Sequence, residues 1–334
     1  MPRYPELIFI HSSFRTSSTW LWQKFRTQQD TLCFYEPHNE FLLHADAETM
    51  LSRTPENWAS GHPGSAPYFA EYMPLLSEGG IVQGMDPTIP YASYVSPEGP
   101  LADITDVNQN YLSLLVDHAR SCNKRAVIGC TRSIGRVAGI RRALGGTHIF
   151  MYRPLLSQWL SYVEQHDKGE SYFLDSMGRI VVQSSGHNPF MAALKDRYWI
   201  GRDTENNFMG FRDHREAETV FLLIHLYFYA YSKMSADFSI STRRLGQSRI
   251  YNLFCSSYLS FKSRNRIELS DFRERIHDGY ADAGAHIKDV RDLLAHHLPP
   301  KADHRFIGSL IAEYESDLDT LRSVIGAEKK RGFA

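Results

Sequence analysis

Residues 7–25, LIFIHSSFRTSSTWLWQKF, carry the pattern that decides the fold. The apolar run 7–10 predicts a buried strand, and 20–25 predicts the first turns of a helix. Between them lies a polar loop with four consecutive hydroxyl residues, Thr16 to Thr19, directly after Arg15. A strand that leads through such a loop into a helix is typical of the first unit of an α/β sheet.

The same alternation continues along the chain. Further strands are expected at 31–35, 126–130 and 148–152, and helices at 106–120, 137–144 and 154–165. Strands that alternate with helices are joined by right-handed crossovers and form a parallel sheet. We therefore expect a three-layer α/β fold, with a central parallel sheet flanked by helices.

The 334 residues are expected to form a single domain. Two stretches, at about 45–108 and 167–215, show no core of their own in the pattern, so we interpret them as insertions. The part from 216 to 334 is expected to be mainly helical. Its most apolar stretch, 220–231, is shorter than the roughly 20 residues of a membrane span. No signal peptide is evident, and we expect a cytoplasmic protein without a transmembrane segment.

Charge and cysteine content narrow the classes of function. Lys and Arg number 37 and Asp and Glu 38, which gives a formal charge of −1. This balance disfavours a nucleic-acid coat or a polybasic membrane tether, although it leaves room for a local basic pocket. The four cysteines have no CxxC spacing. They are expected to be free thiols in a reducing compartment, and no metal site is expected.

The loop 11–19 has the composition of an anion site. A helix N-terminus offers unpaired N–H groups and a partial positive charge, and Arg15 adds a full charge. The alternative is that Ser18 or Thr19 only caps the helix. The chain contains neither a Gly-Lys pair nor a Gly-x-Gly sequence, so the common phosphate-binding and dinucleotide-binding motifs are absent. It also lacks the His-Glu-x-x-His and Gly-x-Ser-x-Gly motifs.

The sequence RTSSTWL at 15–21 resembles the phosphosulfate-binding loop of sulfotransferases that use 3′-phosphoadenosine 5′-phosphosulfate (PAPS). A second motif of that family has an Arg at a strand end, a nearby Pro, and a Ser eight residues after the Arg. Arg153, Pro154 and Ser161 are similar to it. The chain is closer to the Golgi-type and bacterial members than to the cytosolic class. It departs from the family in three places: Ser17 stands where Gly is usual, Pro154 follows Arg153 directly, and the adenine-binding loop has no clear counterpart.

The resemblance implies a P-loop-like sulfotransferase fold, PAPS as the donor and no metal. It assigns two sets of donor-binding residues. The 5′-phosphosulfate would be held by Arg15, Thr16, Ser17, Ser18, Thr19 and Trp20, and the 3′-phosphate by Arg153 and Ser161. Arg15 would also stabilise charge on the leaving phosphate, as a catalytic residue.

Glu36 is the first candidate for the base that takes the acceptor proton. It lies 21 residues after Arg15, at the end of the second expected strand, where the Golgi-type enzymes place a Glu. His38 is the alternative, as the cytosolic class uses a His. A structural interpretation remains open for each residue: Glu36 would form an ion pair with Arg15 or cap the strand, and His38 would lie in an exposed turn.

Arg132 and Arg136 follow the third expected strand and could bind the 3′-phosphate or an acidic acceptor. An ordinary cap with solvated charges explains them equally well. Two groups of aromatic residues in the insertions are expected to form the acceptor cleft: Tyr68, Phe69, Tyr72, and Tyr198, Trp199, Phe208, Phe211.

The predicted function is transfer of a sulfuryl group from PAPS to a hydroxyl or amine acceptor, such as a carbohydrate or small molecule. The partner would be this small-molecule or glycan acceptor and not a nucleic acid. Two alternatives remain. One is a divergent nucleotide-dependent kinase. The other is a catalytically silent protein that binds 3′-phosphoadenosine 5′-phosphate (PAP), the product left by PAPS, or another phospho-ligand. The sequence does not decide the oligomeric state.

Overall fold

The computed structural model describes residues 3–53, 67–92, 94–96, 98–198, 200, 214–274 and 284–331. The chain divides into two compact units, each formed by two segments. The first unit comprises Met1–Tyr152 and Ser235–Arg273, and the second Arg153–Met234 and Glu274–Ala334. The single domain expected from the sequence stays a prediction.

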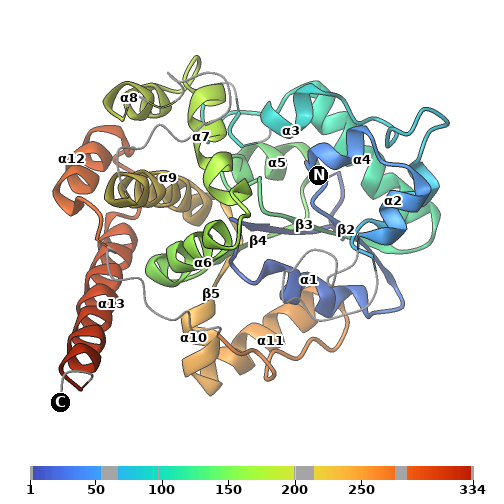
Figure 1. Ribbon diagram of the computed structural model, residues 1–334. Coiled ribbons are helices and arrows are strands. Elements are labelled where there is room, and N and C mark those ends of the chain that lie inside the picture. Colours follow the sequence, from blue (N-terminus) through green and yellow to red (C-terminus); the bar gives the residue numbers. More distant parts are fainter. Residues whose placement is uncertain are drawn as a thin grey trace. The chain divides into compact units, whose positions relative to one another are not determined.

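The first unit is built on a parallel sheet of five strands in the order β2-β3-β1-β4-β5 (Figure 1). The strands are β1 (Ile8–Ser12), β2 (Thr31–Tyr35), β3 (Arg125–Cys130), β4 (Thr147–Tyr152) and β5 (Phe238–Ser241). Every pairing between neighbouring strands is parallel, which confirms the expected α/β class. The sequence pattern missed β5, because four residues between two helices carry too little periodicity to separate a strand from a loop.

The central strand β1 is buried along its whole length. Its Ile10 lies opposite Gly129 of β3 on one side and Ile149 of β4 on the other. A strand covered on both faces needs a continuous apolar run, and the sequence LIFI supplies it.

Helices cover both faces of this sheet (Figure 1). Helix α1 (Ser18–Arg26) packs against β2 and β3 on one face, and α4 (Asp106–Ser121) packs against the same strands on the other face, next to α5 (Val137–Leu144). Helices α10 (Thr242–Gln247) and α11 (Arg249–Ser263) follow β5 and lie on the α1 side. The layered arrangement that the alternation predicts is therefore confirmed for this unit.

The first expected insertion contains short helices: η1 (Glu40–Leu43), α2 (Ala47–Ser52), η2 (Ala70–Leu75) and α3 (Thr88–Ala92). Its aromatic residues Tyr68, Phe69 and Tyr72 are at most 1 % exposed and join the core of the first unit. The expectation that they line an open acceptor cleft is wrong, because their rings pack against those of β2: the Phe34 and Tyr72 centroids lie 5.2 Å apart.

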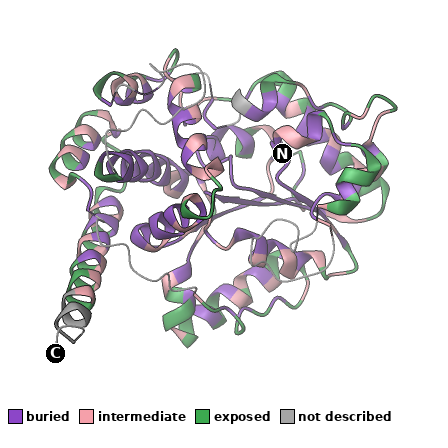
Figure 2. Ribbon diagram, viewed as in Figure 1, coloured by how far each residue is buried: buried purple, intermediate pink, exposed green. Residues whose placement is uncertain are grey.

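The second unit is helical. Its helices are α6 (Leu155–Asp167), α7 (Tyr172–Ser184), α8 (Pro189–Arg197), α9 (His214–Ser235), α12 (Ile287–His297) and α13 (His304–Arg331). The apolar stretch 220–231 lies within the buried part of α9 (Figure 2). Tyr198 is buried, whereas Trp199, Phe208 and Phe211 lie outside the described residues. Among the helices that the structure describes, none is long and apolar enough to cross a membrane.

Candidate functional site

The candidate site lies at the carboxyl end of β1, where the connections between strands change direction across the sheet. The connection from β1 runs outward to β2, whereas the connection from β4, its neighbour on the other side, runs outward to β5. In open parallel sheets, ligands bind beyond the carboxyl ends of strands at such a switch point. The hydroxyl-rich loop begins at this position, directly after Ser12.

Two loop residues adopt a left-handed backbone conformation. Arg15 has φ 61° and Ser17 has φ 64°, a region that L-residues rarely occupy. Position 17 therefore adopts the conformation that the usual glycine of the resembled motif would supply, so the departure at this position does not prevent the fold of the loop. Thr16, which lies between them, is fully buried and donates from Oγ1 to the carbonyl oxygen of Ser13 at 2.8 Å.

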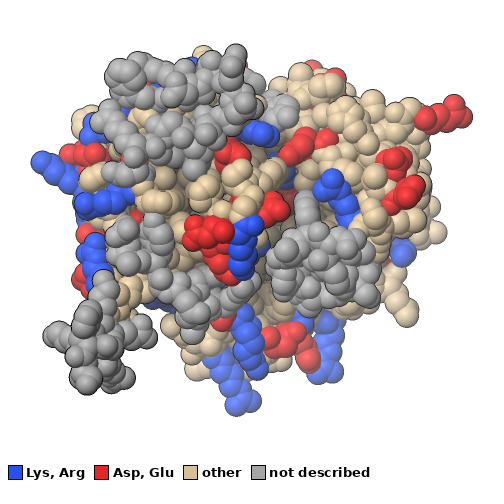
Figure 3. Space-filling view, viewed as in Figure 1, with Lys and Arg blue, Asp and Glu red and all other residues tan. Residues whose placement is uncertain are grey.

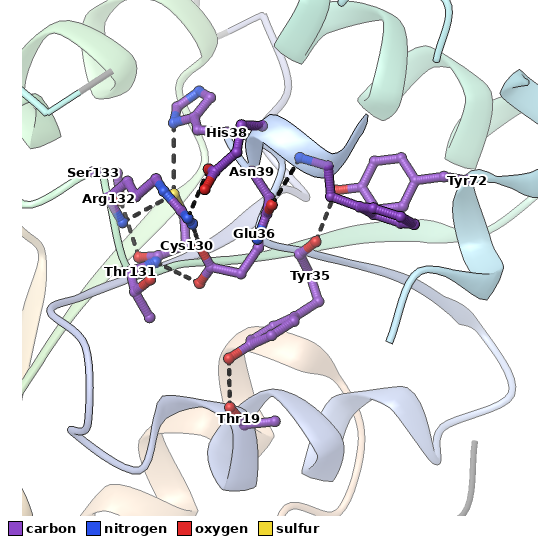
Figure 4. A network of polar contacts seen from close by, with 12 residues as sticks. Thr19, Tyr35, Glu36, His38, Asn39, Tyr72, Cys130, Thr131, Arg132 and Ser133 are labelled. Atoms are coloured by element: carbon purple, nitrogen blue, oxygen red, sulfur yellow. Dashed lines mark hydrogen bonds and ion pairs between the residues drawn. The ribbon is translucent and has the colours of Figure 1, made fainter. Parts of the chain in front are cut away.

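The N-terminus of α1 offers hydrogen-bond donors and no negative charge. Ser17 is the N-cap residue, but its side chain makes no capping hydrogen bond, and the first turn holds no acidic residue. Ser18, Thr19 and Trp20 have no helical carbonyl partner for their N–H groups by the geometry of a helix start. The interpretation that Ser18 or Thr19 caps the helix is wrong, because Thr19 Oγ1 instead lies 2.5 Å from Tyr35 Oη on β2 (Figure 4).

The two ends of the loop differ in exposure. Ser18 and Thr19 are 4 % and 2 % exposed, and the Trp20 ring packs edge-on against Phe272 at 4.9 Å. Arg15 is only half-buried. This combination of a half-buried cation and a helix start free of acids favours a negatively charged group at this position.

Glu36 is held at the carboxyl end of β2 by three contacts. It has φ 49°, and its N–H donates to the Gly129 carbonyl oxygen at 2.7 Å. Its carboxylate accepts from the Thr131 N–H at 2.7 Å and from Arg132 Nη1 at 2.6 Å (Figure 4). Burial raises the pKa of Glu36, while Arg132 and Thr131 oppose that rise by favouring the carboxylate. The ion-pair partner is thus Arg132 and not Arg15, the partner considered from the sequence.

Arg132 forms ion pairs with two carboxylates. Besides Glu36, it contacts Glu40 Oε2 from Nη2 at 3.1 Å, and its guanidinium lies 5.2 Å from the Phe14 ring. Its side chain is 2 % exposed. The interpretation of Arg132 as a solvated surface charge is wrong, because the loop after β3 turns it inward onto the end of β2.

Arg136 is fully buried as well, but some of its N–H groups have no hydrogen-bond partner. Its Nη2 reaches the Val95 carbonyl oxygen at 3.4 Å, whereas Nε and Nη1 have no hydrogen-bond partner. Burial lowers the pKa of Arg136 to about 9. The solvated-charge interpretation is wrong here too. Of the two arginines expected to bind an acidic acceptor, Arg136 is the one with unused donors.

His38 is buried beside this group, not in an exposed turn. Its Nε2 lies 3.2 Å from Asn108 Oδ1, and its Nδ1 lies 3.5 Å from Cys130 Sγ. Because Oδ1 only accepts, Nε2 carries the proton and Nδ1 accepts from the thiol. Burial and the nearby Arg136 hold the pKa of His38 well below its usual value. Both ring nitrogens are thus engaged in hydrogen bonds.

Two buried histidines, His11 on β1 and His148 on β4, form a pair that the sequence analysis missed. His11 Nδ1 lies 2.8 Å from Ser133 Oγ, and its Nε2 lies 2.9 Å from His148 Nδ1. His148 Nε2 in turn faces the Gly145 carbonyl oxygen at 2.8 Å, so it must carry the proton there. The other hydrogen bonds then have a fixed direction: the Ser133 hydroxyl donates to His11 Nδ1, and His11 Nε2 donates to His148 Nδ1. Strand register places these rings together, and a single sequence gives no signal for it.

The second motif lies in the other unit. Arg153 is 5 % exposed, with Nε 3.9 Å from Glu274 Oε1, and Ser161 is fully buried on α6. The structure therefore brings together Glu36, His38, Arg132 and Arg136 at the ends of β2 and β3, with the β1 loop in the same unit. Arg153 and Ser161 belong to the second unit.

Within the described ranges, no cluster of three or more His, Cys, Asp or Glu side chains could hold a metal ion. The four cysteines are free thiols, and three of them are buried. No protein-family model, no curated protein and no solved structure matches the chain.

Proposed function

We propose that the protein transfers a sulfuryl group from PAPS to a hydroxyl or amine acceptor, such as a carbohydrate or small molecule. The observation that carries this proposal is the β1 loop. Its two left-handed residues, Arg15 and Ser17, precede a helix start that has no acidic residue and no side-chain cap, at the switch point of the sheet. On this proposal the first unit is a P-loop-like sulfotransferase scaffold.

The roles follow from the donors of the loop. Arg15, Ser18 and Thr19, with the free N–H groups of the helix start, bind the 5′-phosphosulfate, and Thr16, Ser17 and Trp20 shape the loop around it. The resemblance assigns the 3′-phosphate to Arg153 and Ser161, which belong to the second unit. The acceptor oxygen attacks the sulfur, the bond from sulfur to the phosphate oxygen breaks, and Arg15 stabilises the charge that develops on the leaving phosphate.

Glu36 takes the acceptor proton in this scheme. Burial raises the pKa of its carboxyl, which makes the carboxylate a better base than an exposed one. Arg132 and the Thr131 N–H hold the carboxylate in one orientation. Arg132 is therefore a positioning residue, and an acidic acceptor would be bound by Arg136, which has unused donors.

The proposal is tested by thermal shift of the full chain with PAP, AMP and ATP. We expect stabilisation by PAP well above that by AMP or ATP, because a ligand that binds only the folded state stabilises it in proportion to RT ln(1 + [L]/Kd). Arg15→Ala and Arg153→Ala should each abolish the shift, whereas Arg305→Ala, an exposed cation elsewhere, should keep it. Equal shifts with ATP and PAP, or none with PAP, would contradict the proposal.

A silent PAP-binding protein is the second candidate, and one observation favours it. Glu36 is 3 % exposed, and its carboxylate already accepts two hydrogen bonds. Turnover separates the candidates: PAP release from PAPS is measured with carbohydrate, aryl and amine acceptors. On the transferase proposal, Glu36→Gln lowers turnover by about 10²- to 10⁴-fold and leaves the PAP shift in place. Absence of turnover with every acceptor, together with an intact PAP shift, would establish the silent protein.

A further inference from the structure

Helix α11 has two apolar faces, and only one of them is used by the core. Tyr251, Cys255 and Leu259 point inward and are buried in the core of the first unit. The opposite face is exposed: Ile250 is 82 %, Leu253 57 %, Phe254 57 % and Phe261 78 % exposed.

These four side chains form one surface, which we call the α11 face. Ile250, Phe254 and Phe261 are spaced four and seven residues apart, so they follow one stripe of the helix with Leu253 beside it. The α11 face accounts for four of the nine large hydrophobic residues that are exposed in the described part of the chain. A surface helix normally presents polar residues to solvent, and a concentrated apolar patch marks a place where something binds.

The sequence around the α11 face is strongly basic. Between Thr242 and Ile267 there is no Asp or Glu. The same stretch holds six cations: Arg243, Arg244, Arg249, Lys262, Arg264 and Arg266. All but Arg243, which is half-buried, are exposed. Basic side chains lie along the lower edge of Figure 3, where Figure 1 places α10 and α11, with a smaller group of acidic side chains between them.

Neighbouring acids match only part of this charge. Glu268, just beyond the stretch, contacts Arg266, and Asp30 accepts a hydrogen bond from Asn265 at 2.7 Å. The near-neutral charge of the whole chain therefore conceals a local excess of positive charge, which sits beside the exposed apolar side chains.

A hollow of about 740 Å³ opens at the C-terminal end of the α11 face. Phe261 lines it together with three cations, Lys262, Arg264 and Arg266. Its volume is within the range of small-molecule sites, and its charged lining suits an anionic headgroup.

We propose that the α11 face docks on the surface of an anionic lipid membrane. Ile250, Leu253, Phe254 and Phe261 enter the boundary between headgroups and acyl chains, and the flanking cations bind anionic headgroups. A second copy of the chain fits less well, because a two-fold contact through this face would bring like charges together. A nucleic acid fits less well too, because it offers no apolar phase for exposed Ile and Leu side chains.

The test is co-sedimentation of the full chain with vesicles of phosphatidylcholine alone and of phosphatidylcholine with about one-third phosphatidylserine. We expect binding only to the anionic vesicles, and weaker binding as salt rises, because salt screens the attraction. Arg264→Gln with Arg266→Gln should weaken binding by about tenfold or more. Phe254→Ser with Phe261→Ser should also abolish most of the binding, since it removes the inserted area.

Matched variants away from the face separate docking from general effects. Lys301→Gln with Arg305→Gln removes the same charge, and Leu51→Ser with Val107→Ser removes exposed apolar side chains; both should bind as the unaltered chain does. Circular dichroism checks that each variant is folded. Equal binding to neutral vesicles, or no binding to either kind, would overturn the proposal. Two other outcomes would also overturn it. One is a dimer in sedimentation equilibrium that the α11-face variants abolish while vesicle binding persists. The other is salt-sensitive binding of a DNA duplex that these variants abolish while vesicle binding persists.

Discussion

Left-handed backbone conformations gather at the candidate site. Arg15, Ser17 and Glu36 all have positive φ, at the carboxyl ends of β1 and β2. Each such conformation costs an L-residue about 1 kcal/mol or more, so the surrounding contacts must over-determine it. At Glu36 these contacts are the hydrogen bond to the Gly129 carbonyl and the ion pair with Arg132.

Loss of Arg132 tests the weight of this ion pair. Arg132→Ala leaves a buried carboxylate unpaired, so we expect the free energy of unfolding to fall by about 3–5 kcal/mol. Urea denaturation measures it. Adding Glu36→Gln to Arg132→Ala should recover part of the loss, because it removes the unpaired charge.

Arg291→Ala is the matched control, because its partner Glu315 lies 2.9 Å away at an exposed site. There the expected loss is at most about 1 kcal/mol. A similar small loss for Arg132→Ala would mean that the Glu36–Arg132 pair does not hold the end of β2.

At the scale of elements, close approach of backbones fixes where α5 lies. A Cβ added at Gly139 would meet the Ala102 carbonyl oxygen at 2.5 Å and the Ile104 nitrogen at 2.9 Å. Helix α5 thus packs directly on the chain at 102–104. Arg136 is the N-cap residue of α5, so this packing also limits where the loop after β3 can end.

Gly139→Ala and Gly308→Ala are expected to change the free energy of unfolding in opposite directions. In α13 nothing lies within 4 Å of a Cβ added at Gly308. Alanine there is expected to raise the free energy of unfolding by up to about 1 kcal/mol, through helix propensity alone. At Gly139 the clash with backbone outweighs propensity, and a fall of about 1–3 kcal/mol is expected. Thermal and urea unfolding of both variants measure the difference; a gain at Gly139 would show that α5 is free to shift.

At the scale of the whole molecule, buried neutral histidines tie stability to pH. His148 lies in the first unit and His225 in the second, and burial lowers the pKa of each to about 4. Both must be neutral in the folded chain, while their unfolded pKa is about 6.5. Their contribution is therefore complete above about pH 6.5 and is lost as pH falls towards 4.

The expected loss between pH 7 and pH 5 is about 2 kcal/mol for each of these histidines. Urea unfolding at the two pH values measures it. His148→Asn should reduce the fall by about one histidine's share. His304→Gln, at an exposed histidine, should leave it unchanged. A pH-independent free energy of unfolding over this range would show that protonation does not disrupt the buried rings.

The sequence by itself determined the parallel α/β class, four of the five strands and the loop at the end of β1. Apolar runs and helix periodicity are local, and a run such as LIFI is buried in any parallel sheet that contains it. It also placed Glu36 and Arg132 correctly at strand ends. It did not pair them, because a contact between residues almost 100 positions apart depends on strand order.

Only the tertiary structure decided which charged side chains form ion pairs and which keep unpaired donors. Strand order sets β2 beside β3, so Arg132 meets Glu36 while Arg136 keeps unused donors. Burial of α11 along one face only left its other apolar face in solvent. Charge balance and periodicity are sums over the chain, whereas pairing and exposure depend on which surfaces meet, and that is why the sequence did not show them.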